Sequence, residues 1–365
     1  MSAADARAAI RALRVGAAPV NHAALLSVGQ EAVQGVFDRT LARLAAAEPT
    51  NPILVEGPWG SGKSQTLALA RALARERAIA AATVTFNART VPLSHPNRLY
   101  PVLAQTIEVG GATGLRSVVR NCLNDPILNG RLASFANERA DAFGAALRDL
   151  HGANSRGDKL LLGRSGAWSI LLGVDLTIRD DQGRKLAAVG RLGALAALMR
   201  ACGHGGLVVL GDELESLGQL WSSASRASAY NAMGSLLGVP SILWVFGAAG
   251  NFERMVAYDL DQGMRSSWRV KDAGRSFFGQ WCAGDFRRLS PPLLGRDEAE
   301  RLALAVAALY EVGYGLKDAG DGLEVVIAAW VDDPARNPRR LARGLVEMLD
   351  GARDMPSLRD QSSAS

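Results

Sequence analysis

The chain has 365 residues, of which 48% are hydrophobic and 21% charged, enough apolar material for one large globular domain or two smaller ones. The net charge of +5 is compatible with nucleic acid as a partner but does not specify one. Residues 1–20 lack the apolar core of a signal peptide, no apolar stretch could span a bilayer, and the three cysteines form no C-x-x-C pair. We therefore expect a cytoplasmic protein with no membrane partner.

The N-terminal part alternates helical and extended patterns. Apolar and basic residues at helical spacing predict a helix over 3–14 and a second helix from about 30 to 47. The turn Val28-Gly29-Gln30-Glu31 lies between them. The short apolar run at 52–56 predicts a buried strand.

The next eight residues, Gly57-Pro58-Trp59-Gly60-Ser61-Gly62-Lys63-Ser64, fit the phosphate-binding pattern G-x-x-x-x-G-K-[ST] at every fixed position. A helical pattern from Gln65 to Arg77 follows, so the strand–loop–helix context is present. Glycines let backbone N–H groups approach phosphates, Lys63 would reach the β- and γ-phosphates, and Ser64 would ligate Mg²⁺. The alternative is a Gly-rich turn that binds no ligand. A strand, a Gly-rich loop, Lys-Ser and a helix rarely occur together by chance, which favours the phosphate site. We expect ATP to contact Gly57, Pro58, Trp59, Gly60, Ser61, Gly62, Lys63, Ser64 and Gln65.

The middle of the chain is harder to interpret. Patterns predict a strand at 81–86, helices at 99–107 and 187–201, and strands at 207–210 and 241–246. Residues 109–185 look like a mostly helical insertion, with a Gly-rich break near 152–166 and a hairpin-like piece near 171–178. This insertion is a candidate partner-specific surface.

Two acids follow the 207–210 strand. Asp212 would hold Mg²⁺ through its water shell, and Glu213 would act as general base toward the attacking water. Surface acids often follow strands, so it is the preceding phosphate-binding pattern that favours the metal interpretation. After the next strand, Asn251 is a candidate sensor of the γ-phosphate; the alternative is a helix cap.

Strands alternating with helices predict an α/β fold with a parallel sheet flanked by helices, and the phosphate-binding pattern makes it a P-loop NTPase fold. The fading strand pattern after residue 290 predicts a C-terminal all-helical lid. The expected domains are an ATPase core with N-terminal helices at 1–290, a lid at 291–350 with helices near 296–309, 322–330 and 339–349, and a flexible tail at 351–365. From the lid, Arg339, or secondarily Arg340, could reach the γ-phosphate; an exposed basic helix start is the alternative.

Four of the arginines between Asn251 and Pro291 could supply an arginine finger to a neighbouring subunit, or could be ordinary surface arginines. They are Arg254, Arg265, Arg269 and Arg275. Arg265 or Arg269 is favoured, and such a finger is worth roughly 10³–10⁵ in rate.

In this order the motifs resemble those of AAA+ ATPases. The turn at 28–31 resembles the V-G-R-E box of the origin-recognition-like and STAND-like branches, which implies that Val28 and Gly29 lie against the adenine, with Gln30 replacing the usual Arg. Further stretches resemble the ATP-binding proteins of BREX-type phage-resistance systems. They lie at 9–16, 86–88, 97–100, 206–215, 225–231 and 337–350.

This resemblance implies a bacterial defence ATPase that forms a homo-oligomer and acts with other defence-system proteins on DNA. The alternative is a nucleotide-gated switch with little turnover, which Glu213 argues against; a small-molecule P-loop kinase is a weaker possibility. No zinc finger, helix-turn-helix or aromatic–basic stacking pattern is visible. We expect Trp59 to pack on a neighbouring helix, and an approach to the nucleotide is the alternative. Five other tryptophans are expected in the core or an interface rather than in contact with a cofactor: Trp221, Trp244, Trp268, Trp281 and Trp330.

Overall fold

In the computed structural model, the described residues are 1–19, 22–158, 166–174, 188–316, 320 and 322–354. The chain divides into two compact units. The helical unit comprises Met1–Gly35, Gly57–Ala72 and Ser290–Ser365, and the sheet unit comprises Val36–Glu56 and Leu73–Leu289. The division into an ATPase core and a lid stays a prediction.

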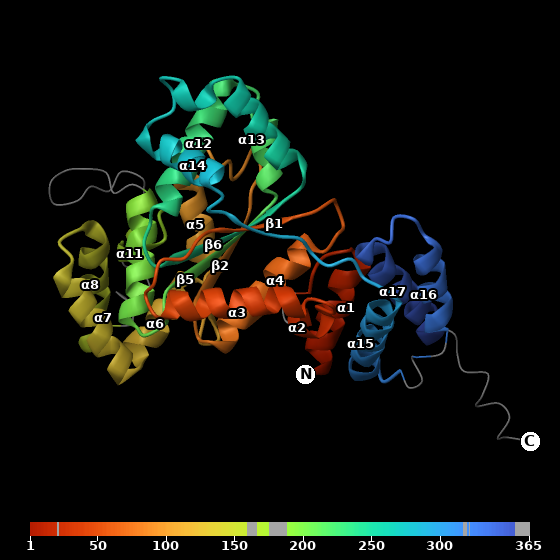
Figure 1. Cartoon of the computed structure of the whole chain (residues 1–365). Helices are drawn as coiled ribbons and strands as arrows, with labels where there is room; N and C mark the ends of the chain where they lie inside the picture. The colour runs from red at the N-terminus through yellow and green to blue at the C-terminus, as the bar shows by residue number, and fades with distance from the viewer. Residues whose placement is uncertain (20–21, 159–165, 175–187, 317–319, 321, 355–365) are drawn as a thin grey trace, which may run out of the picture. The chain divides into compact units, whose positions relative to one another are not determined.

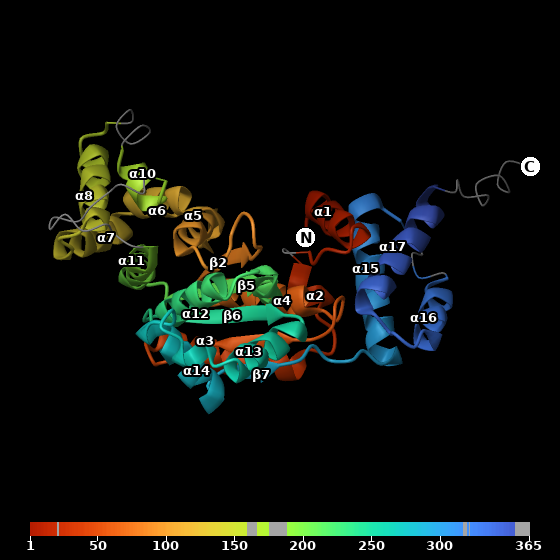
Figure 2. The same ribbon diagram turned by 90° about the horizontal axis from the view of Figure 1, so that it is seen from above.

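The sheet unit is built on seven strands in the order β4-β3-β2-β5-β6-β1-β7 (Figures 1 and 2). Neighbours pair in parallel except at the β2-β3-β4 end. The predicted α/β fold with a sheet flanked by helices is therefore confirmed. The sheet is parallel as predicted except at β3 and β4, whose antiparallel pairing was not predicted. The strands are β1 (Ile53–Glu56), β2 (Ala80–Thr85), β3 (Glu108–Val109), β4 (Ala112–Thr113), β5 (Leu207–Asp212), β6 (Ile242–Ala248) and β7 (Arg287–Leu289).

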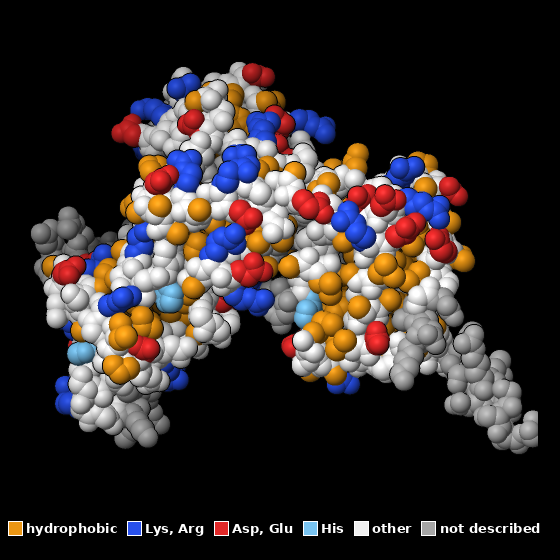
Figure 3. Space-filling view, turned by 60° about the horizontal axis from the view of Figure 1, so that its bottom comes forward, with side chains coloured by type: hydrophobic (Ala, Val, Ile, Leu, Met, Phe, Trp, Pro, Cys, Tyr) orange, Lys and Arg blue, Asp and Glu red, His pale blue; other side chains and the backbone are white. Residues whose placement is uncertain are grey.

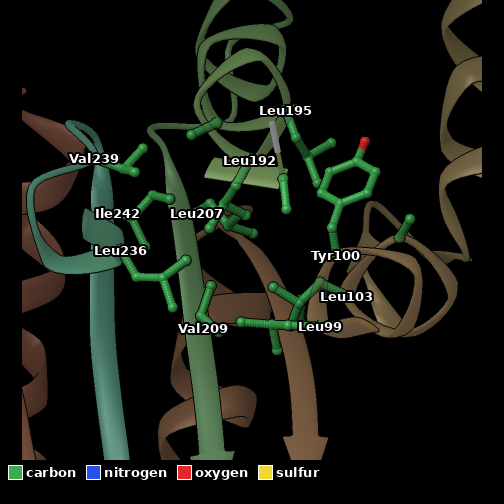
Figure 4. Packing of buried hydrophobic residues seen from close by; sticks show 14 of the residues in the cluster. Leu99, Tyr100, Leu103, Leu192, Leu195, Leu207, Val209, Leu236, Val239 and Ile242 are labelled. Carbon is green, nitrogen blue, oxygen red and sulfur yellow. The ribbon is translucent and has the colours of Figure 1, made fainter. Parts of the chain in front are cut away.

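Central strands are buried on both faces, which explains their continuous apolar sequences. In Figure 4, Val209 of β5 faces Leu99 of helix α5 (Pro96–Thr106), and Leu207 of the same strand lies beside Leu192 of helix α11 (Ala188–Ala201). The hydroxyl of buried Tyr100 donates to the carbonyl oxygen of Leu171 (2.7 Å), so its polar end is satisfied inside the core.

In the described part of the sheet unit, helices and two 3₁₀ segments accompany the strands. They are α5 (Pro96–Thr106), α6 (Leu115–Asn124), α7 (Pro126–Glu138), α8 (Ala142–Ser155), α10 (Ala167–Leu171), α11 (Ala188–Ala201), η2 (Leu214–Gln219), α12 (Ser223–Leu237), α13 (Asn251–Asp261), η3 (Met264–Ser266) and α14 (Asp272–Ala283). The described part of the 109–185 insertion is thus largely helical. Its hairpin is β3–β4, turning at Gly110 and Gly111 with positive φ angles, whereas Leu171 ends a helix. The rest of the hairpin expected near 171–178 and most of the 152–166 break lie outside the described residues.

Two cysteines far apart in the sequence meet inside the sheet unit. The thiol of Cys122 on α6 lies 3.7 Å from that of Cys202, one residue beyond α11, and both are buried. Cys282 is exposed. The two buried thiols therefore contribute mainly as apolar packing between α6 and α11.

The helical unit packs the N-terminal helix against helices of the C-terminal part of the chain. It contains α1 (Ala3–Arg14), α2 (Ala23–Leu26), α15 (Arg296–Tyr314), α16 (Leu323–Asp332) and α17 (Pro338–Asp354), and the starts of α3 (Glu31–Ala45) and α4 (Lys63–Glu76). Arg14 donates twice to the Asp350 carboxylate (2.9 and 2.8 Å), which also accepts from the Tyr310 hydroxyl (2.8 Å). These bonds join α1, α15 and α17.

Helix α17 continues to Asp354, so the first four residues of the expected 351–365 tail are helical. The remaining tail lies outside the described residues. Among the helices that the structure describes, none is long and apolar enough to cross a membrane.

Candidate functional site

The 57–64 loop begins directly after β1 and ends in the first turn of α4. Gly60 and Gly62 have φ angles of +81° and +105°, which glycine adopts without the strain that other residues would suffer. A Cβ atom added at Gly60 would lie 2.4 Å from Nδ2 of Asn337. Gly60 is therefore required both for the backbone conformation and for the close approach of the α17 start.

Lys63 is held inside this loop. Its ammonium donates to the carbonyl oxygens of Gly57 (2.9 Å) and Pro58 (3.0 Å), and the residue is only 8% exposed. No acidic residue lies in the first turn of α4, so the positive end of the helix is not neutralised locally. The hydroxyl oxygen of Ser61 is buried without a hydrogen-bond partner among the described residues. A cation, a helix N-terminus and a buried polar atom in one loop fit an anionic ligand such as a phosphate.

The turn at 28–31 packs on the same helix start. Gln65 donates to Ala23 O and Ser27 Oγ (both 2.9 Å), and Thr66 donates to Oε1 of Gln30 (3.1 Å). Gln30 is 6% exposed, so this residue, which stands where the resembling box has Arg, makes a buried structural contact. Gln65 therefore orients the N-terminal segment against α4; contact with a nucleotide by Gln65, Val28 or Gly29 stays a prediction.

Gly29 is sterically required at this turn. Its φ angle is +70°, and an added Cβ would lie 3.0 Å from Cγ of Glu298 on α15. Glu298 in turn accepts a hydrogen bond from the backbone N–H of Gly295, the N-cap residue of that helix. The turn at 28–31 is thus fitted between α4 and the first turn of α15.

The structure brings Arg339 to the 57–64 loop. Its guanidinium carbon lies 4.2 Å from the ring centroid of Trp59, and Nδ2 of Asn337 approaches the Trp59 carbonyl oxygen at 3.4 Å. Oδ1 of Asn337 accepts the backbone N–H of Arg339 (2.9 Å). Arg340 instead pairs with Asp333 (3.1 Å). Of the two arginines named from the sequence, Arg339 is the one that contacts the loop.

Trp59 does not pack as we expected. It is 68% exposed, and its ring is covered by the Arg339 guanidinium rather than buried on a helix. Because the cation and the indole are both exposed in part, this contact is worth about 0.5–1 kcal/mol. Such a weak contact can be exchanged for another partner of Arg339.

In the sheet unit, the acids and Asn251 gather at one edge. β5 ends at Asp212, its parallel neighbour β6 ends at Ala248, and β1 on the other side of β6 ends at Glu56. Because the strands are parallel, their carboxyl ends share that edge. This is the edge from which the chain leaves β1 to enter the 57–64 loop.

Glu213 has an unusual backbone. Its φ angle is +62°, a left-handed conformation that costs a residue other than glycine roughly 1–2 kcal/mol. Its N–H donates to the carboxylate of Asp212 (2.9 Å), which helps to hold the turn. Strain of this kind clusters at functional sites, so the observation favours a functional role for the second acid.

The sequence did not single out Glu215, which joins the two loops at this edge. Its carboxylate accepts the backbone N–H of Ala249 (3.0 Å), two residues before Asn251. The spacing Asp-Glu-x-Glu after a strand was the available signal. Glu215 acts as a positioning residue between the turn after β5 and the turn after β6.

Asn251 is the first residue of α13 and is exposed, while Gly250 occupies the cap position. The alternative interpretation of Asn251 as a helix cap is therefore wrong. Its role as a sensor stays a prediction.

Glu56 is a second residue that the sequence analysis missed. Its carboxyl is partly buried, and burial raises its pKa; Arg288 of β7 opposes this shift from 3.8 Å, and Glu253 adds to it. Glu56 directly precedes Gly57, the first residue of the 57–64 loop.

The four finger candidates are all exposed, and Arg275 pairs with Asp272 (3.1 Å). Arg265 lies in η3. Arginine fingers act across subunits, so the choice among Arg254, Arg265, Arg269 and Arg275 stays a prediction.

Comparison with known proteins decides the family. The family model described as BREX system ATP-binding protein BrxC/D matches residues 1–125 and 124–252. The chain belongs to this BrxC/D family. The resemblance to BREX ATP-binding proteins is thus confirmed. The family is an ATP-binding component of a phage-defence system, and this system contains other proteins. The match includes the 57–64 loop and the edge that carries Asp212 and Asn251. No curated protein matches the chain.

Proposed function

We propose that this BrxC/D-family protein is a Mg²⁺-dependent ATPase with an AAA+-type P-loop fold. The observation that carries the proposal is the 57–64 loop, with Lys63 buried in it and Arg339 against it. Glycines at +81° and +105° and an unpartnered Ser61 hydroxyl support phosphate as its ligand.

Each residue has a distinct task in this proposal. The loop N–H groups and Lys63 bind the phosphates. Ser64 would ligate Mg²⁺, Asp212 would hold the ion through its water shell, and the ion would neutralise phosphate charge. Among the described residues no group of three acidic, His or Cys side chains gathers. Magnesium that is shared with phosphates and water needs only one or two protein ligands, so these residues fit it.

Glu213 accepts a proton from the attacking water, and Asn251 orients that water near the γ-phosphate. Glu215 keeps the turns that carry both residues in register through its bond to Ala249. Two observations at this sheet edge support these roles. Glu213 has a strained backbone, and Glu215 joins the turn after β5 to the turn after β6.

We further propose that subunits assemble and that one arginine completes the site of a neighbouring subunit; the candidates are Arg265, Arg254, Arg269 and Arg275. ATP turnover would then drive DNA-linked or partner-linked conformational changes in the cytoplasm.

The second candidate function is a nucleotide-gated switch. The contact between Trp59 and Arg339 favours the switch function. A ligand that breaks this contact would release the start of α17.

ATP hydrolysis with and without duplex DNA separates the two functions. Glu213→Gln is expected to keep ATP binding and to lose about 10²-fold or more of turnover, because only proton acceptance is removed. Turnover that DNA stimulates and that Glu213→Gln abolishes supports the ATPase. Tight ATP binding with negligible turnover in the wild type, unchanged by DNA, favours the switch.

Arg339→Ala is expected to lower kcat by about 10²-fold, the usual effect of removing one group that stabilises transition-state charge. Steady-state hydrolysis at saturating ATP measures it. Arg340→Ala is the matched control, since it removes the same charge from the adjacent position, where it pairs with Asp333. Equal kcat values for the two variants would exclude a catalytic role for Arg339.

A further inference from the structure

The segment between α13 and α14, residues 262–271, carries an exposed tryptophan among cations; we call it the Trp268 loop. Trp268 is 74% exposed, and the guanidinium carbon of Arg269 lies 4.6 Å from its ring centroid. Arg265 and Lys271 are exposed in the same loop. Sequence analysis placed Trp268 in the core or an interface, and the core assignment is wrong.

This loop is anchored at several points. Met264 and Val270 are buried in the core (6% and 0% exposed). Asn231 of α12 donates to the carbonyl oxygen of Arg269 (2.9 Å) and accepts the N–H of Lys271 (2.7 Å). The backbone on both sides of the indole is therefore fixed. Trp268 is presented on a preorganised support, so a ligand that stacks on it pays little ordering entropy.

The loop also concentrates positive charge. It contains Arg265, Arg269 and Lys271 and no acidic residue. None of these three side chains has an ion-pair partner among the described residues. By contrast, arginines of the C-terminal helices pair with neighbouring acids, and Figure 3 shows acidic and basic side chains intermingled over those helices. The unpaired cations favour a polyanionic ligand.

We propose that the Trp268 loop binds single-stranded DNA. The indole stacks on an unpaired base, while Arg265, Arg269 and Lys271 contact the flanking phosphates. A duplex fits less well, because its bases are already stacked on each other and do not offer a free face to the ring. This inference rests on the DNA-linked part of the proposed function and names the form of DNA that the protein binds. It also revises the sequence analysis, which found no aromatic–basic stacking pattern.

An arginine-finger role for this loop makes a different demand. A finger uses Arg265 or Arg269 at a neighbour's phosphates and has no use for the Trp268 ring. Stacking requires the ring itself. Replacing the tryptophan therefore distinguishes the two roles without touching a finger candidate.

The test is fluorescence anisotropy of the full-length protein with a labelled oligothymidine of about 16 nucleotides, and with a duplex of the same length. Trp268→Ala is expected to weaken single-strand binding by about 5- to 100-fold, the usual value of one stacked base. Trp268→Phe is expected to recover part of this loss. Lys271→Ala is expected to lower the salt slope of log K by about 0.7.

Trp221→Ala is the matched control. Trp221 is 99% exposed and precedes α12, outside the basic loop, so its variant is expected to bind like the wild type. The inference would be overturned if both tryptophan variants lost the same affinity for single-stranded DNA, or if Trp268→Ala bound it like the wild type. Tighter binding of the wild type to the duplex than to the single strand would also overturn it.

ATP turnover without DNA separates this inference from the proposed function. Trp268→Ala is expected to hydrolyse ATP like the wild type. If single-strand binding is absent while hydrolysis persists, only the inference fails. If Trp268→Ala loses turnover without DNA, the loop is part of a subunit interface and the inference is wrong.

Discussion

Replacing Lys63 with alanine is expected to weaken ATP binding by about 10- to 100-fold, because a charge-assisted contact to the phosphates is lost. In the structure the ammonium already lies in the 57–64 loop, between the carbonyl oxygens of Gly57 and Pro58. A phosphate entering the loop would therefore meet a positioned cation. Isothermal titration calorimetry with ATP and Mg²⁺ measures the affinity.

Arg343→Ala is the control for this experiment. It removes one positive charge from an exposed position on α17, where the side chain pairs with Glu347 at 3.7 Å. Thermal unfolding without nucleotide checks that both variants are folded. An unchanged ATP affinity in folded Lys63→Ala would refute the proposed phosphate site.

Replacing Asp259 with alanine is expected to lower the free energy of unfolding by about 3–5 kcal/mol, the usual cost of breaking a buried ion pair. The Asp259 side chain is fully buried and accepts three hydrogen bonds from Arg226, at 2.9–3.1 Å, and one from the Tyr230 hydroxyl (2.8 Å). Its removal leaves a largely buried guanidinium uncompensated. Urea unfolding followed by circular dichroism measures the change.

Asp272→Ala is the matched control, because Asp272 is fully exposed and pairs with Arg275 only across one helical turn. Its free energy of unfolding is expected to change little. A double variant, Arg226→Met with Asp259→Leu, is expected to recover much of the stability by removing both charges. A loss in Asp259→Ala no larger than in Asp272→Ala would mean that the pair does not hold α12 to α13.

Local patterns predicted the central strands, the helical character of the 109–185 insertion and the helices α1, α3, α4, α5, α11 and α15 to α17, because the apolar residues of these segments are periodic. Helices α2, α12 and α14 were not predicted. β7 was missed because it has three residues, two of them arginines, so no apolar pattern marks it. The β3–β4 hairpin has two-residue strands, and its Gly-Gly turn was the available signal. β3 pairs with β2 and β4 pairs with β3, and a local window cannot detect the pairing with the distant β2.

Site residues were predictable where a single motif specifies them. The 57–64 loop and the acids after β5 belong to such motifs. The contacts of Gln30 with Thr66 and of Arg339 with Trp59 join residues that are distant in sequence, so no spacing rule reports them. The exposure of Trp268 was also missed, because tryptophan is usually buried, and only the anchoring of its loop explains why this one is not.

The pairing of β1 has a consequence for synthesis of the chain. β1 is made early, yet its two neighbours in the sheet are β6 and β7, the last strands to leave the ribosome. Until then, the apolar residues Ile53, Leu54 and Val55 have no partners for their backbone groups. Folding of the sheet is therefore a late, non-local event, and the nascent chain is exposed to aggregation over most of its translation. Chaperone dependence should thus be strongest for ribosome-bound chains that end before residue 242.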